Sequence, residues 1–397
     1  MIPSLRQDFN QRFTRAKYSE FEKEMAARCG VPVAFRLCET PCFFPKQLLD
    51  RMSQAGAELI LQLTGNADYR KVSDASIPAA FRAPNESEHP MFVQVDFGLV
   101  RDSSGQLQPK LVELQAFPSL YAYQPVLSQT YLDVFGLDSN LQYFLSGLNA
   151  ESYQQALSSA ILAGHDPEQV ILMEIDPLEQ KTLPDFLLTE RALGIPTVNI
   201  TDVKQDGKQL FYQADGRKIP IRRIYNRAIV DELERKSLNL NFRFTDDLDV
   251  EWAGHPNWFF RMSKFSIPYL RHESVPQTVF LNQVEGVPPD LHRYILKPLF
   301  SFAGLGVNIR PTAQDVAAIP SAQRSQWILQ ERLNFEPIIA TPDGPTKAEV
   351  RIMYIWDQEL LPVLVILRLG RGAMMGVDHN KNMQWVGSSA ALFVASE

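Results

Sequence analysis

The stretch that decides the fold is Tyr294-Ile-Leu-Lys297-Pro-Leu-Phe-Ser301-Phe-Ala-Gly304-Leu-Gly306-Val-Asn308-Ile. An apolar run ends at Lys297, a short Ser/Gly loop follows, and a second apolar run begins. This pattern predicts a β-hairpin whose tip carries too little side chain to block a closely approaching ligand. Backbone N–H groups in such a loop can point at phosphate oxygens, and the lysine adds a full charge. An ordinary hairpin with a stray lysine fits the same residues, because Gly-rich loops are common.

Composition limits the class of protein. The chain has 397 residues, enough for two or three domains. Its net charge of -7 gives no bulk basic character and argues against a nucleic-acid partner. No apolar run reaches about 18 residues, so we expect no membrane-spanning helix. The N-terminus lacks a signal-peptide pattern, and Cys29, Cys38 and Cys42 form no CxxC pair, so a cytoplasmic protein with reduced thiols is expected.

The N-terminal third divides into a helical segment and an acidic hairpin. Residues 1–90 look mostly helical, because residues 44–63 place apolar side chains at helical spacing. Two β-rich runs then surround a polar turn, and they carry Asp96, Glu113 and Gln115. Acids on strands are costly to bury unless a cation lies nearby, so we expect a cation at this hairpin.

Residues 150–235 follow the pattern of an open α/β domain. A continuous apolar run from Val170 suits a strand that is covered on both faces. A helix then ends at Gly194 and a second strand begins, which makes a βαβ unit. Residues 219–227 are predicted as one further strand that ends in polar groups.

The pattern of the last third of the chain predicts an α+β fold. Lys264 follows an aromatic run that approaches a helix, and Lys297 comes about thirty residues later. A strand with a Gln-Glu pair at Gln330 follows, and two alternating strands then carry Arg351 and Arg368.

This order of two lysines, a Gly loop, a Gln-Glu strand and two arginine strands resembles the ATP-grasp superfamily, in which two α+β subdomains clamp ATP. Such a clamp normally ends in an acidic magnesium-binding strand pair. Here that pair comes early in the chain, which looks like the circular permutation of the glutathionylspermidine-synthase-like branch. The resemblance covers roughly residues 90–395.

The resemblance implies a mixed α+β and α/β fold. It combines an ATP-grasp clamp of two α+β subdomains with a pre-ATP-grasp open α/β domain, and the chain is circularly permuted. The implied segments are a mostly helical start at 1–90, the permuted magnesium hairpin at 91–125, the pre-ATP-grasp α/β domain at 150–235 and the clamp at 250–397.

The resemblance also implies a role for each candidate residue. These are Lys264 and Lys297 on the phosphates; Ser301, Ala303, Gly304 and Gly306 in the covering loop; Gln330 and Glu331 beside adenine and ribose; Asp96, Glu113 and Gln115 on Mg²⁺; Arg351 and Arg368 on the γ-phosphate or acyl phosphate; and Asn226 and Arg227 near the substrate. Gln115 departs from the usual asparagine by one methylene, which can loosen a site that demands near-octahedral geometry.

Several of these candidate residues also fit purely structural roles. Lys264 could be a solvated lysine on a helix, and Asp96 could simply pair with an arginine. The two arginines could be plain cross-strand partners of Glu349 and Asp357. Asn226 and Arg227 end a strand of the α/β domain, where ligands often sit, but they fit a structural role equally well.

The function that these features predict is an ATP-dependent carboxylate–amine ligase that acts through an acyl phosphate. The expected cofactors are ATP and Mg²⁺, and the expected partners are a small-molecule or peptide carboxylate and an amine acceptor. One alternative is an ATP-grasp-like protein that binds nucleotide without ligase activity. Another is an unrelated α/β protein that binds no nucleotide.

Overall fold

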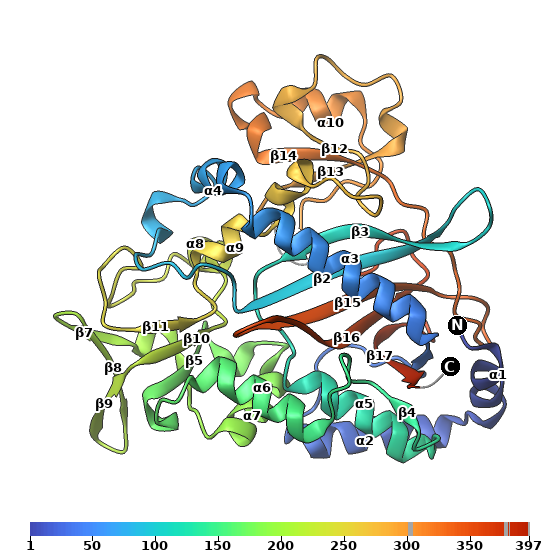
Figure 1. Cartoon of the computed structure of the whole chain (residues 1–397), viewed down its shortest axis with the longest axis horizontal. Coiled ribbons are helices and arrows are strands. Elements are labelled where there is room, and N and C mark those ends of the chain that lie inside the picture. Colours follow the sequence, from blue (N-terminus) through green and yellow to red (C-terminus); the bar gives the residue numbers. More distant parts are fainter. Residues whose placement is uncertain (301–304, 377–379, 381, 396–397) are drawn as a thin grey trace.

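The computed structural model describes residues 1–300, 305–376, 380 and 382–395, and a large mixed sheet lies at its centre (Figure 1). Its strands are β1 (Cys42–Phe43), β2 (Phe92–Arg101), β3 (Leu107–Gln115), β4 (Leu141–Gln142), β15 (Lys347–Trp356), β16 (Leu360–Gly370) and β17 (Gly387–Val394). They are ordered β1-β17-β16-β15-β2-β3, and β4 pairs with β17. The early hairpin β2–β3 is therefore hydrogen-bonded, through β2, to the late strand β15.

Three smaller sheets surround the central one. Their strands are β5 (Val170–Glu174), β6 (Thr197–Asn199), β7 (Lys204–Asp206), β8 (Gln209–Ala214), β9 (Arg217–Ile221), β10 (Arg223–Asn226), β11 (Glu251–Ala253), β12 (Thr278–Phe280), β13 (Tyr294–Pro298) and β14 (Trp327–Glu331). The order β11-β10-β5-β6 is wholly parallel, as the predicted βαβ unit requires. The sheets β7-β8-β9 and β12-β14-β13 are antiparallel.

Helices cover both faces of the central sheet. The α-helices are α1 (Pro3–Arg12), α2 (Arg15–Cys29), α3 (Lys46–Thr64), α4 (Ala67–Asp74), α5 (Tyr123–Phe135), α6 (Ala150–Leu162), α7 (Leu183–Leu193), α8 (Val230–Lys236), α9 (Asn257–Arg261) and α10 (Ala313–Ala318). The 3-10 helices are η1 (Ala79–Phe81), η2 (Pro167–Gln169), η3 (Pro177–Glu179), η4 (Ile200–Asp202), η5 (Lys264–Tyr269), η6 (Leu281–Gln283), η7 (Leu291–Arg293) and η8 (Ser321–Gln326). In Figure 1, α3 crosses one face, while α5 and α6 lie on the other side of the sheet. None of the helices in the described ranges is long and apolar enough to cross a membrane.

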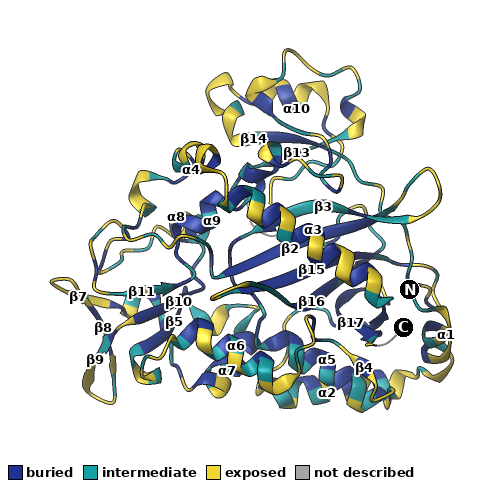
Figure 2. Cartoon of the chain, viewed as in Figure 1, coloured by how far each residue is buried: buried dark blue, intermediate teal, exposed yellow. Residues whose placement is uncertain are grey.

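The alternation along β15 explains why this sheet has one polar patch. Val350 and Ile352 point into the core beneath α3, with the side chains on α3 buried against them. Lys347, Glu349 and Arg351 point to the opposite face, because successive strand residues face opposite sides. Figure 2 shows the central strands as largely buried, so this polar patch is enclosed rather than solvated.

Gly56 marks the closest approach of α3 to the central sheet. A Cβ at this position would lie 2.1 Å from the Tyr354 hydroxyl oxygen and 2.9 Å from its ring. Gly56→Ala should therefore lower the free energy of unfolding by about 1–3 kcal/mol, although alanine is the better helix former. Urea denaturation measures this loss, and the exposed Gln54→Ala on the same helix should change stability by less than about 0.5 kcal/mol. A stabilised Gly56→Ala protein would contradict this packing.

Two sequence predictions need correction, and one strand has no counterpart among the predictions. In the described part of the predicted 294–309 hairpin, the second run forms a single bridge, from Asn308 to Leu296. The antiparallel partner of β13 is β14. The single strand predicted at 219–227 is divided between β9 and β10, which lie in different sheets. Strand β17 was not predicted, because its Gly-Ser-Ser start lacks the usual β-forming residues.

Candidate active site

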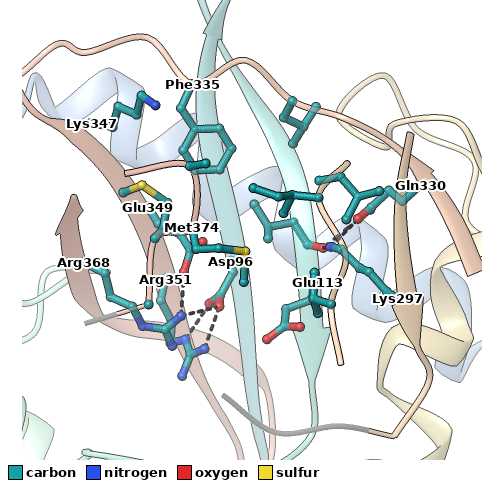
Figure 3. A pocket seen from close by; sticks show the side chains of 18 of the residues that line it. Asp96, Glu113, Lys297, Gln330, Phe335, Lys347, Glu349, Arg351, Arg368 and Met374 are labelled. Atoms are coloured by element: carbon teal, nitrogen blue, oxygen red, sulfur yellow. Dashed lines mark hydrogen bonds and ion pairs between the residues drawn. The ribbon is translucent and has the colours of Figure 1, made fainter. Parts of the chain in front are cut away.

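A cavity of about 630 Å³ lies between the small sheet β12-β14-β13 and the polar face of the central sheet (Figure 3). Its described lining includes eight basic and four acidic side chains, although the chain as a whole carries a net charge of -7. The basic ones are Lys181, Lys264, Lys297, Arg310, Arg332, Lys347, Arg351 and Arg368, and the acidic ones are Asp96, Glu113, Glu331 and Glu349. This concentration of positive charge favours an anionic ligand.

Strand pairing fixes the charged groups on the central sheet. Arg351 lies directly opposite Asp96, and its Nε and Nη2 donate to the two carboxylate oxygens at 2.5 and 2.6 Å. Arg368 lies opposite Glu349, to which its Nη1 donates at 2.6 Å, and the same nitrogen is 3.4 Å from Asp96. Figure 3 shows these four side chains as one connected group. The neighbouring carboxylate raises the pKa of Arg351 even though burial alone would lower it.

A β-bulge sets the direction of Glu113. Asp96 pairs with Glu113 but Phe97 pairs with Leu111, so Val112 is the extra residue. The bulge leaves Leu111 in the core under α3 while Glu113 lines the cavity. The Val112 carbonyl, freed from the ladder, accepts a hydrogen bond from Lys297 Nζ at 3.2 Å.

Lys297 reaches the cavity from β13 and is almost fully buried. Its ammonium also donates to the side-chain oxygen of Gln330 on β14, as Figure 3 shows. Burial lowers the pKa of Lys297 to about 8, although the charge of Glu113 acts in the opposite direction. Gln330 is 2% exposed, so its amide orients this lysine from inside the small lobe.

Lys264 and Glu113 form an ion pair across the cavity. Lys264 begins η5, is 8% exposed, and its Nζ lies 3.4 Å from the Glu113 carboxylate. Burial alone would raise the pKa of Glu113, but the charges of Lys264, Lys297 and the two arginines lower it to about 2. The alternative of a solvated helix lysine at Lys264 is therefore wrong.

The predicted magnesium ligands do not form an open donor set. Both oxygens of Asp96 are held by Arg351, and Glu113 pairs with Lys264. The Gln115 amide is satisfied when its oxygen, rather than its nitrogen, faces Arg351. In this orientation the oxygen accepts hydrogen bonds from Nη1 and Nη2 of Arg351 at 3.0 Å. Among the described residues, no three His, Cys, Asp or Glu side chains are grouped closely enough to hold a metal ion. As arranged, these residues do not fit Mg²⁺.

The predicted residues of the phosphate-covering loop are only partly described by the structure. Ser301, Ala303 and Gly304 lie outside the described residues. Gly306 has a positive φ of 72°, and a Cβ there would meet the Pro298 ring at 3.1 Å, so this position requires glycine. Glu331 lines the cavity beside Gln330.

Asn226 and Arg227 are not among the described lining residues of this cavity. Both are buried, and the Arg227 guanidinium lies over the Phe117 and Phe186 rings at 5.0 and 5.4 Å. Its Nε and Nη1 have no hydrogen-bond partner within the described chain. Their role near the substrate stays a prediction.

Two of the ion pairs that were considered as structural alternatives to a functional role are present in the structure. Asp96 does pair with an arginine, and Arg368 does pair with its cross-strand neighbour Glu349. Asp357, the other suggested partner, instead accepts a hydrogen bond from Ser159 at 2.6 Å. The two arginines therefore have structural partners and also line the cavity.

Sequence reasoning missed several lining residues. Lys347 could have been found, because it shares the alternation of Glu349 and Arg351. Phe335 and Met374 lie in segments with no periodic signal, yet both project into the cavity (Figure 3). They supply apolar surface beside the charged group.

No protein-family model and no curated protein matches the sequence. The fold, however, has a counterpart among solved structures. The apo form of a glutathione synthetase-like effector from Globodera pallida aligns with a TM-score of 0.61, 12% identity and 96% coverage of both chains. A proposed gamma-glutamylcysteine synthetase from Methylobacillus flagellatus KT covers 80% of this chain and 83% of its own, with 15% identity and a TM-score of 0.40. The first likeness shows a shared mixed α/β fold.

Proposed function

We propose that the chain is an ATP-dependent ligase that joins a carboxylate to an amine. The observation that carries this proposal is the cavity, whose described lining has eight basic and four acidic side chains in an acidic protein. Such a lining suits a polyphosphate, because clefts with one dominant sign of charge concentrate the opposite charge. The shared fold with a glutathione synthetase-like effector supports ligase chemistry rather than simple anion storage.

The finer proposal is a circularly permuted ATP-grasp clamp. Two lysines from outside the central sheet line the cavity, Lys297 on β13 and Lys264 on η5. The hairpin β2–β3 precedes the α/β segment in the chain but pairs with β15 in space, which supports a permuted order. In this arrangement the polyphosphate lies between the lysines and the arginines, and adenine lies against the apolar side chains near Glu331.

The proposed chemistry has two steps. A carboxylate oxygen of the substrate attacks the γ-phosphorus of ATP and ADP leaves, which forms an acyl phosphate. The amine nitrogen then attacks the acyl carbon, and phosphate leaves as the amide forms and a proton is released. The lysines neutralise the phosphate oxygens. The side chain of Arg368 is 26% exposed, and it can therefore contact the γ-phosphoryl group during its transfer. The proposed chemistry requires that water be kept away from the acyl phosphate, which it would hydrolyse.

The test is ADP release from ATP with pairs of amino acids and γ-glutamyl peptides as acid and amine. We expect ADP only when both substrates are present, and hydroxylamine in place of the amine should trap the acyl group as a hydroxamate. Lys297→Met should lower the rate at least tenfold. Nucleotide binding without ADP release from any pair would instead support the non-ligase alternative, which the pairing of Asp96 with Arg351 also favours.

A further inference from the structure

The two predicted metal ligands Asp96 and Gln115 both face one guanidinium. Arg351 donates to both oxygens of Asp96, and the Gln115 amide lies 3.0 Å from its two terminal nitrogens. Asp96 is 1% and Arg351 6% exposed, and the β2–β15 ladder places them opposite each other. Arg351 therefore already occupies, on Asp96 and Gln115, acceptor positions that a divalent cation would need.

Glu113 alone is a poor substitute site for the cation. Its carboxylate lies 3.4 Å from Lys264 Nζ, and Lys297 and Arg351 line the same cavity. A doubly charged ion placed beside these three cations would be repelled by all of them in an enclosed setting, where charges are weakly screened.

The charge of the lining matches a nucleotide without metal. The described lining carries four more basic than acidic side chains. An ATP molecule without metal carries about four negative charges near neutral pH, and each bound Mg²⁺ cancels two of them. The cavity therefore offers the balance that the metal would otherwise supply.

We infer that this cavity binds the polyphosphate of its nucleotide without a divalent cation, and that Arg351, held by Asp96, supplies the charge in place of the metal. The inference rests on the proposed nucleotide site. It reverses the sequence-based expectation of Mg²⁺ at Asp96, Glu113 and Gln115.

Calorimetric titration of the intact chain with ATP, once in EDTA and once in excess Mg²⁺, tests the inference. We expect the affinity for ATP in EDTA to be at most about threefold weaker than the affinity in Mg²⁺. An affinity at least about tenfold weaker in EDTA would overturn the inference and leave the proposed nucleotide site standing. No binding in either buffer would overturn both.

Arg351→Met sharpens the test. Without the guanidinium, ATP binding in EDTA should fall about tenfold or more, and Mg²⁺ should now restore part of it, because Asp96 and Gln115 become available. Arg351→Lys should keep binding indifferent to Mg²⁺. The matched control is Arg217→Met on the distant hairpin β8–β9, whose arginine pairs with Glu168 at the surface. An Arg351→Met protein with unchanged affinity and no response to Mg²⁺ would overturn the inference, and if this variant does not fold, the wild-type comparison decides alone.

Discussion

Replacing Lys297 with methionine is expected to weaken ATP binding by roughly 10- to 150-fold. The reason is the loss of charge-assisted hydrogen bonds worth about 1.5–3 kcal/mol from a buried ammonium that faces the cavity. Methionine keeps the length of the side chain, so the loss reports charge rather than packing. Calorimetry measures the effect, and the exposed Lys218→Met serves as control, because Lys218 pairs with Asp206 on a distant sheet.

The same lysine predicts a pH dependence. Because burial lowers the pKa of Lys297 to about 8, its positive charge is present below pH 8 and is lost as the pH rises above it. Nucleotide phosphates are already ionised there, since their second pKa is about 6. ATP affinity of the wild type should therefore decline above pH 8, approaching tenfold per pH unit, whereas Lys297→Met should show no such decline. Equal pH profiles for the two proteins would contradict the assignment.

The second large effect concerns the buried pair of Asp96 and Arg351. Asp96→Asn or Arg351→Met alone should lower the free energy of unfolding by about 3–5 kcal/mol, because each removes the two-bonded partner of a buried charge. The double variant should lose much less than the sum, since both charges are then gone.

Urea denaturation of the four proteins gives this double-mutant cycle. The surface pair of Lys218 and Asp206 is the control, and its cycle should yield less than about 1 kcal/mol. Additive losses for Asp96 and Arg351 would mean that the two groups do not stabilise each other as their geometry indicates.

Much of the framework followed from local patterns. The alternation along β15 and β16 predicts strands with one polar face, and the apolar run at Val170 predicts the parallel strand β5. Single charges among apolar residues predict enclosed sites at Glu113 and Lys297, and both residues line the cavity. These features depend on residues close together in sequence.

The remaining features depend on long-range pairing. The bulge at Val112 depends on the register of β2 against β3, which residue types do not encode. The contact of Arg351 with Asp96 joins residues 255 positions apart. Gln330 was expected beside the nucleotide, yet its amide contacts Lys297, which a strand pattern cannot reveal. The contact of Arg351 with both Asp96 and Gln115, which are predicted as magnesium ligands, is hidden for the same reason.

The most direct measurement is a calorimetric titration of the wild type and Lys297→Met with ATP at pH 7. The cationic cavity predicts one bound ATP per chain for the wild type and an affinity at least tenfold weaker for the variant. No heat of binding with the wild type, or equal affinity in the two proteins, would contradict the assignment of this cavity as a nucleotide site.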